Sequence, residues 1–312
     1  MDKIVPYLHT LPRVQAPLSV QINITNRCYS KCIMCAKWRD WPKEDFLSTE
    51  KLIDLFDTFN SMGVQSVVLS GGEPFAREDL LEIVKNKGKL KIGVLTSGLW
   101  NPKLKSEAEK IIKNLDLIHF SLDSIYSETY NLIRGTQGNA CEEVKGNLIW
   151  TNNLIKSGLS QARIKVNIVK QKLNVNEIDD IVNFCKEHEI PYRISPVHTF
   201  DELKADDNFY IIPQRCVVPF FHCVVDFDGE VFFCCHLLND NDYYSNRNIQ
   251  LSIGNVLKES FIEIWFGKKA KNMRKFLMNH KFPECSRCDN RYIHINQAYE
   301  EYIQKLSEPI FL

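Results

Sequence analysis

The stretch Ser19–Cys35, SVQINITNRCYSKCIMC, decides the fold. Its first seven residues, Ser19–Thr25, form a β-rich run that predicts a strand. Cys28, Cys32 and Cys35 follow this strand in a CxxxCxxC spacing. Three thiolates on one loop can bind three irons of a cubane cluster and leave the fourth iron open to another ligand. The alternative is a zinc loop, or a closed cluster that borrows a distant cysteine.

The alternation of strand and helix continues to about residue 197. Longer amphipathic segments such as Thr49–Met62, whose apolar residues recur at helical spacing, separate the β-rich runs. Six such repeats predict an α/β fold, a parallel sheet curled into a partial (βα)6 barrel with its site at the strand ends. After the first run, the predicted strands are Val64–Ser70, Lys91–Thr96, Leu117–Leu122, Ile164–Val169 and Tyr192–Val197.

The last third of the chain predicts a second, smaller unit. Asp226–Gly229 places an Asp-Gly pair between the β-rich runs Phe221–Val225 and Glu230–Cys234, which is a hairpin signal. We therefore divide the chain at a polar linker into a barrel, residues 1–204, and a hairpin and helix domain, residues 205–312. Helical patterns follow the hairpin at Phe261–Met278 and Tyr299–Leu306.

Composition excludes several classes of protein. Lys plus Arg and Asp plus Glu each total 39 of 312 residues, so the formal net charge is zero. Binding to nucleic acid or to a membrane surface would favour a basic excess. No apolar run reaches the length of a membrane span, and the N-terminal segment lacks a signal-peptide core. We expect a cytoplasmic protein that binds neither nucleic acid nor membrane.

The eleven cysteines are the unusual part of this composition. Structural disulfides are rare in a reducing compartment, so clustered thiols suggest metal or iron–sulfur ligands first. Cys216 and Cys234 flank the hairpin, and Cys285 and Cys288 form a CxxC further along. Together they make a plausible four-thiolate cage, although their spacing fits structural zinc almost as well as an iron–sulfur cluster.

The first cysteine group resembles the signature of the radical S-adenosylmethionine (SAM) enzymes. Ser70–Pro74, SGGEP, closes the second predicted strand and resembles the GGEP segment of that family. Gly71 and Gly72 would let the backbone approach a ligand closely, because glycine has no side chain. Glu73 and the nearby carbonyls offer hydrogen-bond acceptors for an ammonium group.

Later strand ends carry further matches to the same family. Ser97 follows the third strand, and Ser121-Leu122-Asp123 at the end of the fourth resembles the SxD element. We expect Ser121 to contact a hydroxyl or carboxylate of the cofactor. Arg134 resembles an arginine that faces the methionyl carboxylate. The resemblance thus makes Gly71, Gly72, Glu73, Ser97, Ser121, Asp123 and Arg134 the candidate cofactor-binding residues.

The resemblance also implies a specific chemistry. A [4Fe-4S] cluster held by three cysteines binds SAM at its open iron. One electron from the reduced cluster then gives methionine and a 5'-deoxyadenosyl radical, which takes a hydrogen atom from the substrate. The protein positions the cofactor and excludes competing reactions. A flavodoxin or ferredoxin-type partner is implied as reductant, and the substrate is a small molecule or a peptide.

The C-terminal third resembles the twitch domain, a short form of the SPASM domain found in many of these enzymes. The resemblance implies that Cys216, Cys234, Cys285 and Cys288 hold one auxiliary [4Fe-4S] cluster, since no cysteine follows Cys288. The tail resembles that of butirosin-type aminocyclitol dehydrogenases, without implying a shared substrate. The matching segments are Cys216, Gly229-x4-Cys234, Ile253–Val256, Glu263–Trp265 and Cys285-x2-Cys288.

Three functions remain open at this point. The first is oxidation of an alcohol or amine carbon, with the auxiliary cluster as electron acceptor. The second is a radical epimerase or peptide-maturing enzyme in which Cys223 or Cys235 donates a hydrogen atom, although either thiol could simply be a buried small hydrophobe. The about eighteen residues before the first strand are too few for a leader-binding domain, which counts against peptide maturation. The third is a zinc or electron-carrier protein without enzymatic activity.

Several side chains near the predicted sites have two interpretations. Arg193, Ser195 and His198 on the sixth strand are candidate substrate contacts, or core polar contacts at the barrel end. Trp38 and Trp41 follow the first cysteine group, where they either cover it or stack on adenine.

Overall fold

The computed structural model describes residues 14–35, 37–38, 42–197, 215–238, 249–283, 285, 288 and 290–307. Within them, nine strands form one sheet in the order β6-β5-β4-β3-β2-β1-β7-β8-β9. The strands are β1 Ser19–Thr25, β2 Ser66–Gly71, β3 Lys91–Thr96, β4 Leu117–Ser121, β5 Arg163–Lys170, β6 Tyr192–Pro196, β7 His222–Val225, β8 Glu230–Phe232 and β9 Gly254–Asn255.

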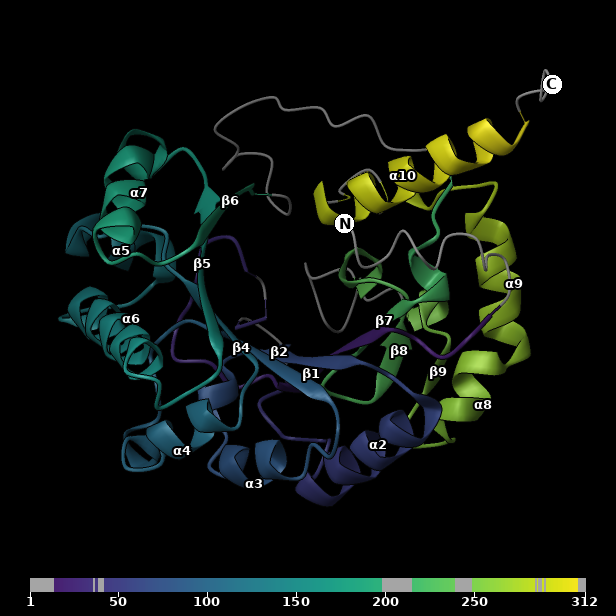
Figure 1. The fold of residues 1–312 in the computed structure, drawn as a ribbon, viewed down its shortest axis with the longest axis horizontal. Helices are drawn as coiled ribbons and strands as arrows, with labels where there is room; N and C mark the ends of the chain where they lie inside the picture. The colour runs from purple at the N-terminus through teal and green to yellow at the C-terminus, as the bar shows by residue number, and fades with distance from the viewer. Residues whose placement is uncertain are drawn as a thin grey trace.

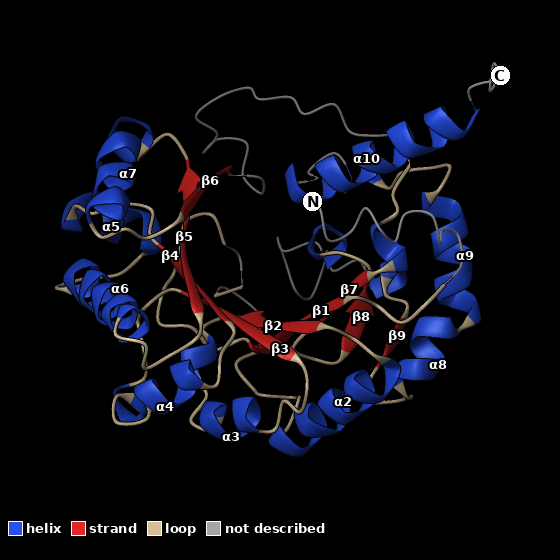
Figure 2. Cartoon of the chain, in the orientation of Figure 1, coloured by secondary structure: helices blue, strands red, loops and turns tan. Residues whose placement is uncertain are grey.

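Strands β1 to β6 pair in parallel with their neighbours, which confirms the predicted βα repeats. The sheet curves, and helices cover its convex outer side (Figures 1 and 2). The helices are α2 Thr49–Met62, α3 Leu80–Lys85, α4 Ala108–Lys113, α5 Ser127–Arg134, α6 Ala140–Lys156, α7 Ile178–Glu187, α8 Phe261–Phe266, α9 Lys268–Leu277 and α10 Asn290–Ser307.

Strand β1 alternates apolar and polar residues, and this pattern separates the two faces of the sheet. Val20, Ile22 and Ile24 are fully buried in the core between sheet and helices. Because successive side chains of a strand point to opposite faces, Gln21 and Asn23 face the concave side. The concave side is therefore the polar side of the sheet.

Strand β2 begins two residues later than the sequence predicts, because Gly63 and Val64 cap the C-terminal end of helix α2. Gly63 adopts a left-handed conformation there, with a φ of 83°, and its N–H donates to the carbonyl groups of Asn60 and Phe59. The Val64 N–H donates to Phe59 O as well. This capping uses the free carbonyl groups of the last helical turn, and the strand starts only after it.

The predicted hairpin is confirmed, and it continues the barrel sheet. Strands β7 and β8 are antiparallel around Asp226–Gly229, where the Gly229 N–H donates to Asp226 O. Strand β7 also pairs in parallel with β1, placing His222 beside Ser19. The C-terminal cysteine segment thus joins the barrel through a shared sheet. The predicted domain boundary at residues 204/205 lies outside the described residues.

Two helical predictions need correction. The stretch Phe261–Met278 is not one helix, because Gly267 is extended, with a ψ of 169°, and separates α8 from α9. The closing helix predicted at Tyr299–Leu306 is part of the longer helix α10, which begins at Asn290. Helix α10 packs on the segment that precedes β7, and its first turns bring residues 293–300 close to Cys216.

Candidate active site

The loop that carries Cys28, Cys32 and Cys35 caps the end of helix α5. The Lys31 N–H donates to Arg134 O at 2.9 Å, and the Ile33 N–H donates to Ile133 O at 3.0 Å. The last carbonyl groups of a helix have no partners within the helix, so a neighbouring segment that supplies N–H donors is held in place. Cys32 is buried, whereas Cys28 is exposed at the start of the loop.

The two predicted glycines support the same loop from the other side. The Gly72 N–H donates to Thr25 O at 2.8 Å. A Cβ atom on Gly72 would lie 2.1 Å from Arg27 O, and one on Gly71 would lie 2.2 Å from Thr25 O. No side chain fits at such distances. In this structure, the close approach that requires glycine is therefore to the backbone leading into Cys28.

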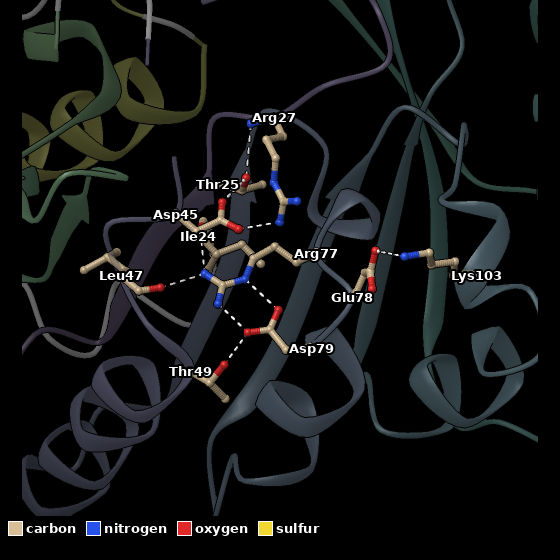
Figure 3. A network of polar contacts seen from close by, with 10 residues as sticks. All are labelled: Ile24, Thr25, Arg27, Asp45, Leu47, Thr49, Arg77, Glu78, Asp79 and Lys103. Atoms are coloured by element: carbon tan, nitrogen blue, oxygen red, sulfur yellow. Dashed lines mark hydrogen bonds and ion pairs between the residues drawn. The ribbon is translucent and has the colours of Figure 1, made fainter. Parts of the chain in front are cut away.

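A network of polar contacts, centred on the buried Arg77, holds the end of β1 in place (Figure 3). The Arg77 guanidinium donates to Ile24 O at 2.8 Å and to Leu47 O at 2.7 Å, and it forms an ion pair with Asp79. Asp79 also accepts a hydrogen bond from Thr49. Arg77 thus links three segments, those that contain Ile24, Leu47 and Asp79.

A second part of the network in Figure 3 lies closer to Cys28. Asp45 accepts a hydrogen bond from Thr25 Oγ1 at 2.6 Å and forms an ion pair with Arg27. The Arg27 N–H donates to Thr25 Oγ1 at 3.1 Å. These contacts fix the residue next to Cys28 and therefore the direction in which the loop leaves the strand.

We expect Arg77→Met to lower the free energy of unfolding by about 3–5 kcal/mol, because it leaves two buried carbonyl groups and the partly buried Asp79 without their donor. Lys103→Met is the matched control. Lys103 pairs with Glu78 at 2.7 Å, and both side chains are exposed, so its loss should cost less than about 1 kcal/mol. Urea denaturation measures both variants. Equal losses from the two variants would contradict a supporting role for Arg77.

Glu73 and Ser97, both predicted site residues, are brought together by the ends of β2 and β3. Glu73 Oε2 accepts from the Ser97 N–H at 2.6 Å and from Ser97 Oγ at 2.5 Å. Glu73 Oε1 accepts from the Phe75 N–H at 3.0 Å and from Thr96 Oγ1 at 2.8 Å. Burial raises the pKa of Glu73, and these hydrogen bonds oppose the shift. Because a carboxylate accepts about four hydrogen bonds, the backbone carbonyls of this turn become the more accessible acceptors for an ammonium group.

Asp123, Arg134 and Cys32 are also brought together. The Arg134 guanidinium pairs with Asp123 Oδ2 at 2.7 Å and donates to Cys32 Sγ at 3.7 Å. Asp123 Oδ1 accepts from the Val169 N–H at 2.7 Å. Burial alone would lower the pKa of Arg134, but Asp123 and Cys32 raise it, so the guanidinium stays charged. The Arg134 guanidinium therefore places a fixed positive charge beside a sulfur of the first cysteine group.

Trp38 and Ser121, two further residues singled out in the sequence, lie on the cysteine loop and on β4. Trp38 Nε1 donates to Cys32 O at 3.0 Å, so its indole lies against the cysteine loop. Ser121 ends β4 and pairs in register with Asn167 of β5, with its side chain on the concave face. Trp41 and His198 lie outside the described residues.

The second cysteine group lies near the amino end of β1, at the opposite end from Cys28. Burial, with a smaller contribution from the nearby Cys285, raises the pKa of Cys216 to about 11. Burial also raises the pKa of Cys234, with contributions from Cys235, Cys216 and Cys285. The Cys288 N–H donates to Cys285 O at 3.1 Å, and the Cys288 side chain packs on the same apolar cluster as Cys216 and Cys234. Cys216, Cys234 and Cys285 thus lie close enough to influence one another's pKa, and together with Cys288 they would fit a cluster, whose iron would replace their protons.

Within the described residues, no group of three or more His, Cys, Asp or Glu side chains is arranged to hold a single metal ion. No helix in the same part of the chain is long and apolar enough to span a membrane.

Asn296 at the second cysteine group was missed by the sequence analysis. Its Oδ1 accepts from the Val217 N–H at 2.7 Å, and its Nδ2 donates to Cys216 Sγ at 3.8 Å. Asn296 lies on α10, in a part of the helix that the sequence pattern left unassigned. No local pattern marks it, because its partners Val217 and Cys216 lie about eighty positions away in the sequence.

Cys223 and Cys235, the two candidate hydrogen-atom donors, lie in different surroundings. Cys223 pairs in register with Val20, so it lies on the helix-covered side of the sheet, where it is fully buried. Arg274, on helix α9, is near enough to influence its pKa, which burial raises. This placement favours packing for Cys223 over the predicted role of hydrogen-atom donor. Cys235 is partly buried and directly follows Cys234 of the second cysteine group.

Basic and amide side chains cover the concave face of β4, β5 and β6. His119 pairs in register with Lys165, and Asn167 pairs with Arg193. Ser195 Oγ donates to Asn167 Oδ1 at 3.3 Å. Arg193 and Ser195, both predicted as substrate contacts, therefore lie on the concave face, as does Lys165, which the sequence analysis did not single out.

Residues 22–185 match the sequence profile of the radical SAM superfamily. The chain belongs to this superfamily. Residues 216–289 match the SPASM iron–sulfur cluster-binding domain. The radical SAM enzyme therefore uses a [4Fe-4S] cluster and SAM, and its C-terminal domain binds auxiliary iron–sulfur, which decides against the zinc alternative left open by the cysteine spacing.

Two curated relatives match part of the chain. The GTP 3',8-cyclase of Lactiplantibacillus plantarum is 30% identical over 182 residues, which are 56% of this chain and 52% of the relative. The probable GTP 3',8-cyclase of Methanocaldococcus jannaschii is 29% identical over 211 residues, 60% of this chain and 67% of the relative. The radical SAM chain thus spans about half the length of the first of these relatives.

Two solved structures share the fold. SuiB of Streptococcus suis bound to S-adenosylmethionine superposes with a TM-score of 0.68 at 15% identity, covering 88% of this chain and 72% of SuiB. The anSMEcpe structure with bound AdoMet has a TM-score of 0.61 at 14% identity, covering 92% of this chain and 96% of that one. The predicted radical SAM barrel with a SPASM-type extension is confirmed.

Proposed function

We propose that this radical SAM enzyme oxidises an alcohol or amine carbon of its substrate, with the auxiliary cluster as electron acceptor. The observation that carries the proposal is the position of the two cysteine groups relative to β1. Cys28 follows the carboxyl end of β1. Cys216 precedes β7 and Cys234 follows β8, so both lie near the amino end of β1. The polar concave face lies between these ends, which would place a substrate between a radical source and an electron acceptor.

The chain's own residues would hold these groups as follows. Cys28, Cys32 and Cys35 would bind the first cluster, and Cys216, Cys234, Cys285 and Cys288 the auxiliary one. When bound, the cofactors supply the electron that cleaves SAM, the group that takes the hydrogen atom and an acceptor for the remaining electron. Arg134 would hold the Cys32 sulfur in place through its contact with Sγ, and Trp38 would shield the loop.

A test of this proposal follows the mass of the substrate. Oxidation of a CH–OH carbon removes two hydrogen atoms, so a product two mass units lighter supports it. A product of unchanged mass in ordinary water that becomes one mass unit heavier in heavy water would contradict it and favour epimerisation. Formation of 5'-deoxyadenosine without a product would show that SAM is cleaved but that the tested compound is not the substrate.

Epimerisation or peptide modification is the second candidate function. The position of Cys235 beside the second cysteine group favours it, as does the fold shared with SuiB, which has been solved with its precursor peptide SuiA. In this version Cys235 would return a hydrogen atom to the substrate. Full turnover by Cys235→Ala would show that Cys235 does not donate the hydrogen atom. Cys223→Ala, which removes a thiol buried in the core, is the matched control.

The concave face favours a substrate that carries an oxyanion. Burial lowers the pKa of Lys165, and the adjacent Arg193 lowers it further. In the described part of the chain, no carboxylate forms an ion pair with either cation. Asn167 and Ser195 would add neutral hydrogen-bonding groups to the two cations. A phosphoryl or carboxylate group of the substrate would relieve the repulsion between them.

We expect Lys165→Met to weaken binding of GTP, the probe suggested by the names of the relatives, by about 10- to 100-fold, because a charge-assisted hydrogen bond contributes about 1.5–3 kcal/mol. Equilibrium dialysis against the reconstituted enzyme measures the dissociation constant. Lys186→Met, which removes the same charge from an exposed position on α7, should leave binding unchanged. Inorganic pyrophosphate and succinate distinguish phosphoryl from carboxylate recognition. Equal affinities of the wild-type and Lys165→Met enzymes for all three probes would contradict an oxyanion site.

A further inference from the structure

Helix α10 reaches the second cysteine group from outside the segment matched by the SPASM profile. That match ends at residue 289, and α10 runs over Asn290–Ser307. Its residues Ile295 and Tyr299 are buried and share one apolar cluster with the segment around Cys216. The other members of that cluster include Val217, Val218, Phe220 and Phe221, with Cys216, Cys234, Cys235 and Cys288 packed against it.

The Asn296 amide contacts both the backbone and the sulfur of this segment. Its Oδ1 accepts from the Val217 N–H at 2.7 Å, and its Nδ2 lies 3.8 Å from Cys216 Sγ. A backbone N–H can only donate, so the atom facing Val217 must be the oxygen. The NH2 group is therefore the part of the amide that faces the sulfur. Asn296 is only 2% exposed, so water competes little for this contact.

Glu300 holds the same segment one helical turn later. Its Oε1 accepts from the Arg215 N–H at 3.0 Å. Residues four apart lie on the same face of a helix, so Asn296 and Glu300 contact the chain on both sides of Cys216. The Cys216 N–H donates to Leu277 O at 3.0 Å, which fixes the cysteine backbone from helix α9. Of these contacts, the one from Asn296 reaches the sulfur.

We propose that Asn296 is a positioning residue that orients the Cys216 sulfur and raises the reduction potential of the auxiliary cluster. The proposal rests on the assignment of Cys216 as a ligand of that cluster. Reduction adds negative charge to a cluster and its sulfurs, and an N–H donor stabilises that charge. Hydrogen bonds to sulfur are among the features that set the potential of an iron–sulfur cluster. A higher potential makes the cluster a better acceptor for the electron left on an oxidised substrate.

The test measures the potential of the auxiliary cluster by itself. A full-length chain with Cys28→Ala, Cys32→Ala and Cys35→Ala lacks the first cluster, so its electron paramagnetic resonance signal reports the auxiliary one. Asn296→Asp keeps an acceptor for the Val217 N–H and removes the donor to sulfur, whereas Asn296→Leu removes both. Glu300→Gln is the matched control, because it keeps an acceptor for Arg215 and does not contact the sulfur.

We expect both Asn296 variants to retain the cluster and to lower its reduction equilibrium constant at least tenfold, which is about 59 mV for one electron. Glu300→Gln should leave the potential unchanged. An unchanged potential in both Asn296 variants would overturn the proposal, as would a shift of the same size in Glu300→Gln. Loss of the cluster from both Asn296 variants would also overturn it, since Asn296 would then be required for assembly instead of tuning.

The same experiment separates this proposal from the assignment on which it rests. In the background that lacks the first cluster, the parent chain should hold about four irons, and adding Cys216→Ala should remove them. A parent chain without iron would refute the auxiliary cluster itself. If the parent chain holds the cluster but its reduction potential is the same with and without the Asn296 substitutions, only the role of Asn296 would be refuted.

Discussion

Cys32→Ala should abolish reductive cleavage of SAM and remove about half of the iron bound by the reconstituted enzyme. Cys32 is the buried member of the first cysteine group, and its sulfur accepts the hydrogen bond from the Arg134 guanidinium. Alanine removes one of three ligands and leaves the buried Arg134 and Asp123 pair without its third partner. Chromatographic detection of 5'-deoxyadenosine, together with an iron and sulfide determination, measures both effects.

Cys185→Ala is the control for Cys32→Ala. Cys185 is a buried cysteine of helix α7 and packs in the core between sheet and helices. Its replacement should lower stability modestly and leave the iron content and SAM cleavage intact. If Cys32→Ala kept full cleavage activity, the CxxxCxxC loop would not be the site of the first cluster. If Cys185→Ala lost iron to the same extent, misfolding would explain the loss.

Gly72→Ala should lower the rate of SAM cleavage by about 100-fold, the effect expected when a reacting group is displaced by about 1 Å. A Cβ atom at this position would lie 2.1 Å from Arg27 O, so the backbone on one side must shift. Arg27 directly precedes Cys28, and the shift would move the first ligand. Overpacking of this kind also destabilises by about 1–3 kcal/mol.

Gly146→Ala is the matched control for Gly72→Ala. Gly146 lies in helix α6 with open space around the added methyl group, so alanine should stabilise the protein slightly. Measuring the free energy of unfolding and the rate of SAM cleavage for both variants separates the loss of stability in Gly72→Ala from its effect on cleavage. A Gly72→Ala enzyme that cleaves SAM at the rate of the wild type would contradict the tight docking of the loop against this turn.

Local patterns predicted the strands and the first helix well. Strands β1 and β3 and helix α2 begin and end at the predicted residues, because alternation, helical spacing and a terminal Gly63 all act within the segment itself. The pairing of β7 with β1 was not predicted. It joins residues about two hundred positions apart, and no local signal distinguishes a free hairpin edge from one that extends a sheet.

The site shows the same division between local and distant information. Motif order predicted that Glu73 and Ser97 lie at neighbouring strand ends, where they do meet. The direct partners of Glu73 and Arg134 could not be predicted, because they depend on side-chain directions across several segments. Asn296 and Lys165 were missed for a related reason: an amide or a lysine signals a site only once its neighbours in space are known.

The iron and acid-labile sulfide content of the anaerobically reconstituted wild-type chain should be measured first, alongside that of Cys216→Ala. About eight of each per wild-type chain, falling to about four in Cys216→Ala with SAM cleavage retained, is the predicted result. It would support two clusters, one in each cysteine group, as the proposed oxidation assumes. About four irons in both chains would contradict the auxiliary cluster and, with it, the proposed path for the second electron.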